Sequence, residues 1–373
     1  MSKPVTNYQC PSCTAPLHFS ASTGRLECDF CGQSYTVEEM DALYAPSDSA
    51  AAPQEPTEAE QSCAAAQLGR DWDDTHMRLY SCPSCGAQLI CEETTAATSC
   101  PYCNNPSVIP GSFRGILRPD FVLPFKLEKK EAVAALKKHY RGKRLLPKAF
   151  TRDNHIEEVK GVYVTFWLFD GETSARISYS ASNSSSYRSG DYQITETKHY
   201  DVLRAGTVRF EKVPVDGSEK MPDAYMDSIE PFDYSALVPF SPAYLPGYLA
   251  EKYDVDAEDA RDKAEDRCAG SAEELLRQTV TGYDSVETES RDIRVRQDHP
   301  RYALLPVWML TTRWKDQNYL FAMNGQTGTM VGDLPADKGR LRAWFWGTFV
   351  TATALFSLFL SGPVGRAIVE LLD

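Results

Sequence analysis

The chain has 373 residues, of which 42% are hydrophobic, and it carries a net charge of −13. This length leaves room for two or more domains with a sizeable core. The acidity argues against a dedicated nucleic-acid binder, because contact with phosphates requires an excess of Lys and Arg. Residues 1–4 contain no apolar segment, so we expect no secretory signal there.

Eight of the eleven cysteines form two quartets with one spacing: a Cys-x-x-Cys pair, fourteen residues, and a second such pair. A shift of 72 positions superimposes the quartets and also aligns Tyr8 with Tyr80 and Leu17 with Leu89. The chain therefore contains an internal repeat of a short unit. The expected metal ligands are Cys10, Cys13, Cys28, Cys31, Cys82, Cys85, Cys100 and Cys103.

This spacing is typical of a zinc ribbon, because each pair lies on a tight turn and two turns complete a tetrahedron of thiolates. The residues that follow the pairs are Thr14, Gly32, Gly86 and Asn104, and three of these tolerate positive φ. A unit of this size buries too little surface to fold alone, so the metal has to supply stability. We expect two structural Zn²⁺ ions.

Two other interpretations of the cysteine pattern fit the sequence less well. A disulfide framework is disfavoured without a secretory signal. Thioredoxin-like chemistry needs one Cys-x-x-Cys on a βαβ unit rather than two matched pairs. Outside the quartets, Cys91 aligns with Phe19 and is expected in a core rather than as a fifth ligand, whereas Cys63 and Cys268 are expected to be free thiols.

The repeats define the predicted organisation of the first third of the chain. Residues 1–37 form the first ribbon and residues 78–112 the second. Residues 38–77 between them are rich in Ala, Glu, Pro and Ser, with ten acidic residues against Arg70 alone. Such a composition cannot bury enough apolar surface to fold, so it predicts a flexible linker.

Residues 113–336 are predicted to form an α+β domain. A helix is expected over Glu128–Arg141, within a basic segment (126–152) that has ten basic and two acidic residues. Hydrophobic β runs begin at residue 159 and continue beyond a predicted loop at 183–190. A second helix is expected over Asp254–Val280, with a break near Gly270, followed by strands around DIRVRQ, YALLPVWMLTTRW and QNYLFAMN.

The stretch Ala343–Leu360 contains eighteen residues without a charge. As a helix it measures about 27 Å, close to the thickness of a bilayer core. Tryptophans stand at its start and Lys338, Arg340 and Arg342 precede it, as at a membrane interface. A buried core helix is the alternative. The sequence predicts one transmembrane helix over 343–362, and hence a single-pass protein of the cell membrane with its N-terminal bulk in the cytoplasm.

Four phrases resemble a family of bacterial membrane-anchored, double zinc-ribbon proteins: LLPKAF (145–150), IEEVKGVYVTFWLFDG (156–171), AYLPGYLAEKYDVDAED (243–259) and FAMNGQTGTMVGDLP (321–335). Members are often labelled as transcription factor IIB-type zinc ribbons or as replication-restart helicases similar to primosomal protein N′. Others look like companions of phage shock protein A. The resemblance implies the ligand set Cys82, Cys85, Cys100 and Cys103 and no catalytic residues.

No catalytic motif accompanies these elements. The chain has no G-x-x-x-x-G-K-[ST] to hold nucleotide phosphates, no H-E-x-x-H and no G-x-S-x-G. We therefore expect a scaffold or adaptor, not an enzyme, at the cytosolic face of a membrane. Its protein partner is expected to resemble phage shock protein A and to act in the membrane-stress response; no small-molecule substrate is inferred. The alternative is a nucleic-acid-binding ribbon protein without helicase activity, for which the basic segment offers the contacts.

Overall fold

The computed structural model describes residues 8–44, 77–92, 100–103, 109–111, 117–147, 150, 159–315 and 317–361. The first ribbon has its own three-stranded antiparallel sheet, followed by a helix. Its elements are β1 (His18–Ser20), β2 (Arg25–Glu27), β3 (Ser34–Tyr35) and α1 (Val37–Tyr44). A capping box starts α1, because Thr36 and Glu39 each bond the backbone N–H of the other. Residues 38–44 of the predicted linker thus form a helix, whereas the rest of the linker lies outside the described residues.

A twelve-stranded sheet contains both the second ribbon and the middle of the chain. The order along its main path is β10, β7, β13, β8, β11, β5, β4, β6. The ribbon contributes β4 (Met77–Ser81), β5 (Gln88–Glu92) and β6 (Ile109–Gly111). The other strands on this path are β7 (Phe121–Val122), β8 (Lys160–Ser189), β10 (Val238–Pro239), β11 (Leu249–Glu251) and β13 (Arg301–Trp314).

Four further strands extend this sheet. They are β9 (Tyr192–Asp216), β12 (Ser285–Gln297), β14 (Gln317–Asn324) and β15 (Met330–Gly332). Strands β9 and β12 pair with β8, whereas β14 pairs with β13 and β15. The helices are α3 (Lys129–Tyr140), α5 (Asp223–Ile229), α6 (Ala257–Gln278) and α7 (Lys338–Ser361), with short 3₁₀ turns η3 (Tyr234–Ala236) and η4 (Pro242–Tyr244).

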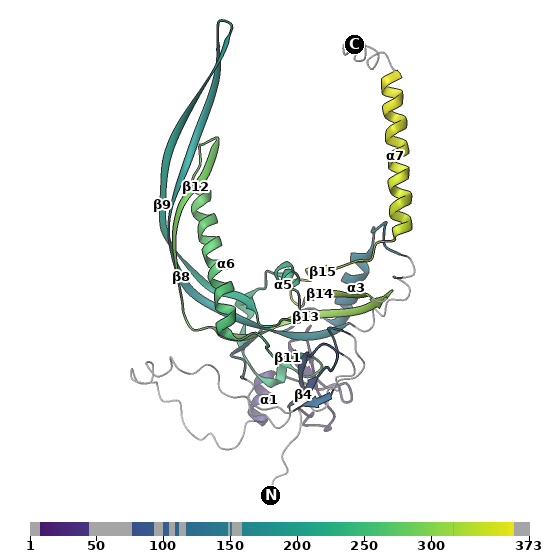
Figure 1. Cartoon of the computed structure of the whole chain (residues 1–373). Coiled ribbons are helices and arrows are strands. Elements are labelled where there is room, and N and C mark those ends of the chain that lie inside the picture. Colours follow the sequence, from purple (N-terminus) through teal and green to yellow (C-terminus); the bar gives the residue numbers. More distant parts are fainter. Residues whose placement is uncertain are drawn as a thin grey trace, which may run out of the picture.

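The long strand β8 changes character along its length. Val162–Phe169 are buried on both faces, as in the centre of a covered sheet. From Thr173 buried and exposed residues alternate, because only one face is covered there. Figure 1 shows β8 and β9 leaving the body as a curved two-stranded hairpin, and α6 lying along one of its faces. We call the part of this hairpin beyond Gly171 the arm.

The arm contains the residues for which the sequence predicts a loop. Residues 183–189 continue in β8, and the turn falls at Gly190–Asp191. Hydroxyl pairs across the strands hold this serine-rich segment extended: Ser184 with Thr197 at 3.0 Å and Ser186 with Thr195 at 2.8 Å. The loop prediction is therefore wrong, since neither face here carries the apolar alternation by which a strand is recognised.

The two helices predicted in the middle of the chain are confirmed as α3 and α6. In α6 the expected break near Gly270 is absent. The buried face of α6 consists of small residues that allow close approach to the arm: Ala257, Ala260, Ala264, Cys268 and Ala272. In the body, Phe125 stacks on Tyr248 with ring centroids 4.3 Å apart and also contacts Tyr163 and Trp308.

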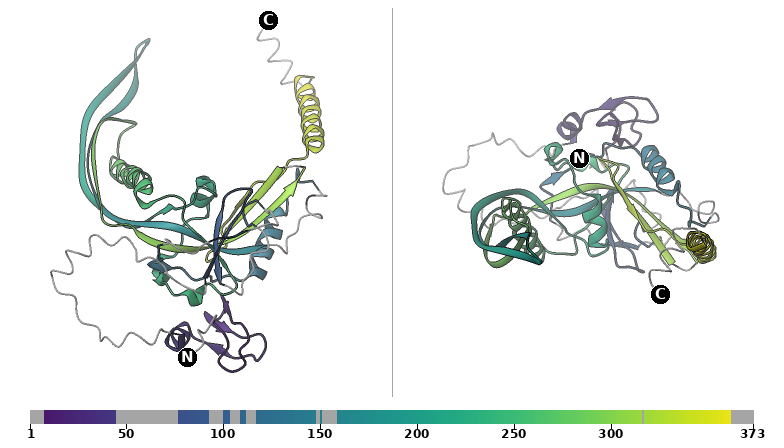
Figure 2. Two further views of the ribbon diagram at one scale, coloured as in Figure 1. Left: turned by 60° about the horizontal axis from the view of Figure 1, so that its bottom comes forward. Right: turned by 90° about the horizontal axis from the view of Figure 1, so that it is seen from above.

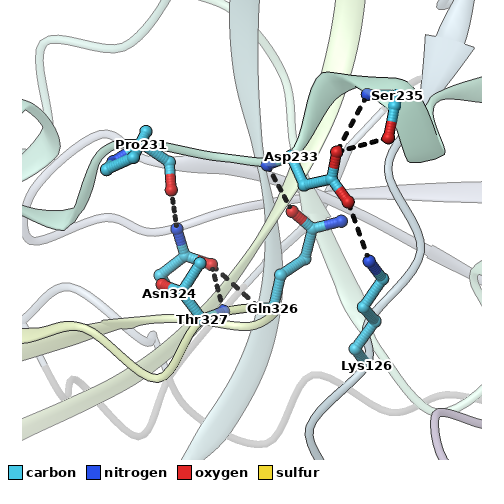
Figure 3. A network of polar contacts seen from close by, with 7 residues as sticks. All are labelled: Lys126, Pro231, Asp233, Ser235, Asn324, Gln326 and Thr327. Carbon is cyan, nitrogen blue, oxygen red and sulfur yellow. Dashed lines mark hydrogen bonds and ion pairs between the residues drawn. The ribbon is translucent and has the colours of Figure 1, made fainter.

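A polar network joins the turn after β14 to the segment after α5 (Figure 3). The amide nitrogen of Asn324 donates to the carbonyls of Ile229 and Pro231, at 2.9 and 3.3 Å. Its amide oxygen accepts from the N–H groups of Gln326 and Thr327. Asn324 is fully buried, so one side chain satisfies four backbone groups that lack other partners in secondary structure.

The fold class differs from the prediction in two respects. The body is mostly β sheet rather than a balanced α+β domain. Residues 343–361 belong to α7, and over the part of the chain that is described, no helix is long and apolar enough to cross a membrane. The predicted transmembrane helix over 343–362, and the single-pass localisation in the cell membrane derived from it, are therefore wrong.

The start of α7 differs from that of the predicted segment. The helix already begins at Lys338, so its described part combines a cationic first turn with hydroxyl residues such as Thr348 and Thr351, which lower its hydropathy. Arg340 donates to the carbonyls of Arg144 and Leu146. Arg340, one of the basic residues that resemble a membrane flank, thus ties α7 to the body, from which the helix projects on the side opposite the arm (Figure 2).

Replacing Asn324 by Ala should destabilise the body by about 3 kcal/mol, because it removes four hydrogen bonds to the backbone, of which those to Ile229 and Gln326 are buried. Urea unfolding followed by tryptophan fluorescence measures the loss. Thr327→Ala is the matched control: its hydroxyl bonds only Thr329 at the exposed turn, and we expect a loss below about 1 kcal/mol. Equal losses in the two variants would contradict the role of the amide.

Candidate metal centres

The first quartet converges at one end of the small sheet of ribbon 1. Cys10 and Cys13 lie on the turn before β1, and Cys28 and Cys31 on the turn after β2. Their four Sγ atoms all lie within 4.8 Å of one another. Sγ of Cys10 is 3.4 Å from that of Cys31, and Sγ of Cys13 is 3.5 Å from that of Cys28. Four zinc–sulfur bonds of about 2.3 Å give sulfur–sulfur edges of about 3.8 Å, so the quartet is close to the size of a zinc tetrahedron.

The second quartet repeats this arrangement. Cys82 and Cys85 follow β4, and Cys100 and Cys103 come between β5 and β6. As in ribbon 1, the first cysteine lies closest to the fourth and the second closest to the third. The Sγ atoms are 3.6 Å apart both in the pair Cys82 and Cys103 and in the pair Cys85 and Cys100. Over the described residues, these two quartets are the groups of Cys, His, Asp and Glu side chains that could hold a metal ion.

The described turns around the cysteines share one backbone geometry; Asn104, which follows the fourth turn, lies outside the described residues. In three of them the residue after the second cysteine has positive φ: 60° at Thr14, 72° at Gly32 and 74° at Gly86. In each turn this residue donates its N–H to the carbonyl of the first cysteine, at 2.8–2.9 Å. Thr14 was not expected in this conformation, which is costly for a β-branched residue. Its hydroxyl donates to the carbonyl of Cys13 at 2.6 Å.

The thiol pKa values fit a site built for a cation. Burial raises the pKa of Cys10, but hydrogen bonds from the Tyr35 hydroxyl and backbone N–H groups outweigh it, and the pKa falls to about 6. In the second quartet the same opposition brings the pKa of Cys82 to about 7, whereas burial raises the pKa of Cys85 to about 11. Hydrogen bonds with Cys103 and Cys82 raise the pKa of Cys85 further, so without a cation the neighbouring thiols hinder its ionisation. A dication removes this hindrance and allows all four to ionise.

The two centres differ in their connection to the rest of the molecule. Ribbon 2 is part of the large sheet, because Ile90 of β5 pairs with Ala250 of β11. Its last turn is also held, since the Thr311 hydroxyl of β13 donates to the carbonyl of Pro101. Ribbon 1 keeps its separate sheet and exposes Cys13 and Cys31, whereas the corresponding cysteines of ribbon 2 are half-buried.

The three remaining cysteines lie elsewhere. Cys91 is fully buried in β5 and packs in the hydrophobic core beside the second quartet, which confirms its prediction as a core residue. Cys268 is buried on the inner face of α6, where burial raises its pKa. Cys63 lies outside the described residues.

A buried carboxyl group near ribbon 2 was missed by sequence reasoning. Glu251 of β11 is 1% exposed, and its Oε1 accepts a hydrogen bond from the Ser218 hydroxyl at 2.6 Å. Burial raises the pKa of Glu251 to about 7, although Ser218 and the Tyr102 hydroxyl partly oppose this rise. An acidic residue at the end of a three-residue strand carries no sequence signal of burial, because the burial comes from strands far away in the chain.

Comparison with known proteins agrees with this arrangement. Residues 9–39, which contain the first quartet, match the family described as Trm112p-like protein. Over 363 residues the chain is 34% identical to "Uncharacterized protein YdjG" of Bacillus subtilis (strain 168), which covers 96% of this chain and 99% of that relative. No solved structure matches the chain. Together with the geometry, these findings identify a zinc-ribbon protein whose two quartets are sites for two structural zinc ions.

Elemental analysis of the purified protein should find two zinc ions per chain. Cys13→Ser and Cys85→Ser should each lose one ion, because three protein ligands do not complete a structural site. Cys85→Ser should also lower Tm by more than about 5 °C, since ribbon 2 shares the sheet of the body, whereas Cys13→Ser should leave the main transition nearly unchanged. Cys91→Val should retain both ions. Equal Tm losses in the two serine variants would contradict the difference between the centres.

Glu251 should make stability depend on pH. Its pKa is about 7 in the folded protein against an ordinary value of 4.5. Between pH 4.5 and 7, the folded protein therefore keeps a proton on Glu251 that the unfolded chain has lost. The free energy of unfolding should therefore fall as pH rises from about 5 to 7 and then level off. Glu251→Gln should remove this fall, which amounts to about 2 kcal/mol between pH 5.5 and 8. Urea unfolding at pH 5.5 and 8, with zinc content checked at both, tests this; parallel pH profiles for the two proteins would refute it.

Proposed function

Since the chain belongs to the same family as YdjG of Bacillus subtilis over nearly all of its length, we propose that it is a non-catalytic zinc-ribbon scaffold that binds a protein partner. Four thiolates fill the coordination shell of a zinc ion and leave no open position for a substrate. Both quartets have this complete donor set. The metal sites therefore favour a structural role, and we expect the protein partner to bind at another surface of the molecule.

The main support for the proposal is the tip of the arm, by which we mean residues 183–198. Strand β12 stops pairing with β8 at Ser182, so from Asn183 to Lys198 the arm consists of two strands alone. Isolated two-stranded hairpins are marginally stable in water, and a chain gains nothing for its own core by extending one. A projecting hairpin of this kind offers backbone edges and side chains to another molecule.

The side chains at the tip support this interpretation. The register of β8 with β9 is continuous from Gly171 to Ser189, so directly opposed residues share a face. Tyr179 and Val202 are opposed and buried in the small core beneath α6. Eight residues further along β8, Tyr187 opposes Ile194 on the same face, and Tyr192 lies next to them. The face that α6 covers near the body therefore continues past the end of α6 with exposed apolar side chains.

These residues are of the kind that anchor protein interfaces. Tyr187 and Tyr192 are 53% and 77% exposed, and Ile194 is 40% exposed. Tyrosine is enriched among the residues that dominate binding energy, because it buries a large rigid surface at low entropic cost. The opposite face of the tip carries the paired serine and threonine hydroxyls and offers no comparable anchor. A phage shock protein A-like protein, suggested by the family resemblance, is the first partner to test.

The test places a photo-crosslinking amino acid at position 192 of the full-length chain in cells, with position 186 on the other face as control. We expect a protein adduct at 192 and not at 186. With the purified partner, replacing Tyr187, Tyr192 and Ile194 together by Ser, Ser and Thr should weaken binding at least tenfold. Zinc content and Tm should not change, because these side chains are exposed. Unchanged affinity in the triple variant would refute the proposal.

A further inference from the structure

One position of the internal repeat has opposite surroundings in the two ribbons. The shift of 72 residues that aligns the quartets places Phe30 on Tyr102, each directly before the last cysteine of its quartet. The structure supports this alignment. The backbone N–H of Cys10 donates to Ala15 at 2.8 Å, and that of Cys82 donates to Ala87 at 2.9 Å. Phe30 and Tyr102 are therefore equivalent aromatic residues on equivalent turns.

In ribbon 2 this aromatic residue anchors the turn to the body. Tyr102 is 8% exposed and packs in the hydrophobic core between the second quartet and the large sheet. The preceding residue, Pro101, is buried as well, and its carbonyl accepts the hydrogen bond from Thr311. The turn thus docks as a unit, with the ring inserted and a backbone carbonyl bonded beside it.

In ribbon 1 the equivalent turn is open to solvent. Phe30 is 79% exposed, and Asp29 in front of it is exposed too. Ribbon 1 contacts the body through a different face: Phe19 packs edge-on against Tyr244 with centroids 5.1 Å apart, and its N–H donates to the carbonyl of Pro246. Docking of ribbon 1 to its own chain therefore leaves the turn with Phe30 free.

Charge around this turn restricts the partner. Exposed carboxylates on ribbon 1 and α1 include those of Asp29, Glu38 and Glu39. Among the described residues of this ribbon and α1, Arg25 is the one Lys or Arg. Its guanidinium lies 3.8 Å from the Glu39 carboxylate and donates to the carbonyl of Ser34. Ribbon 1 with α1 is thus acidic overall, and Asp29 lies directly before Phe30, which favours a partner surface with Lys or Arg.

We propose that the turn Cys28–Gly32 is a docking element of the scaffold, and that Phe30 inserts into an apolar pocket, rimmed by basic residues, of a separate protein. The ring of Phe30 would insert into the partner in the same way as the ring of Tyr102 inserts into the core of this chain. This inference rests on the proposed scaffold function but uses a different surface, at the opposite end of the molecule from the tip of the arm (Figure 1).

The experiment places a photo-crosslinking phenylalanine analogue at position 30 of the full-length chain in cells, with exposed Gln33 as the control position on the same ribbon. The adduct is mapped by mass spectrometry, and binding of the purified partner is then measured. We expect the adduct to lie in an apolar pocket flanked by Lys or Arg. Phe30→Ala should weaken binding at least tenfold and Asp29→Lys should also weaken it, whereas Gln33→Ala should have little effect. Both variants of the turn should retain two zinc ions.

The remaining outcomes overturn the inference. An adduct no stronger at position 30 than at position 33, an adduct with a second copy of the chain, or unchanged affinity of Phe30→Ala would each do so. If position 192 of the arm forms an adduct and position 30 does not, the docking element is refuted while the scaffold stands. If neither position forms one, both proposals fail.

Discussion

The pairing of β11 on both of its edges is the interaction on which the architecture depends. Ala250 pairs with Ile90 of the second ribbon on one side and with Tyr163 of β8 on the other. A ribbon of three short strands cannot bury enough surface to be stable alone. Through β11 its strands become the edge of a twelve-stranded sheet, and the free energy of zinc binding is shared with the body. The second metal centre thus belongs to the core rather than to an appended module.

The features that could be predicted from the sequence are those encoded locally. The cysteine quartets follow from spacing and repeat, because a thiolate pair on a tight turn needs only its own few residues. Helices α3 and α6 were found because each has a regular apolar face, and the strands around β13 because of their dense hydrophobic character. The fusion of ribbon 2 to the body could not be found in this way, since it depends on pairing between residues 89–90 and 250–251.

The errors have physical causes as well. The serine-rich end of β8 has no buried face, so hydroxyl pairing and the partner strand, not periodicity, keep it extended. The uncharged run at the C-terminal end suggested a membrane helix because composition does not reveal where a helix begins. In the structure Arg340 is bonded to carbonyls of the body, and the cationic start is part of the same helix. Glu251 and Asn324 are buried by segments distant in sequence, and a polar residue has no local signature of such burial.

The divergence of the two ribbons follows from where their stability originates. When a metal ion holds the fold, the residues between the ligands are released from forming a core, and the same turn can carry either a buried or an exposed ring. In ribbon 2 the turn packs against the same chain: Tyr102 and Pro101 are buried, and the turn is part of the body. In ribbon 1 the zinc ligands and the contact of Phe19 with Tyr244 already fix the unit. Phe30 is exposed and contributes nothing to that packing, so its ring stays available for the contact that we propose with a separate protein.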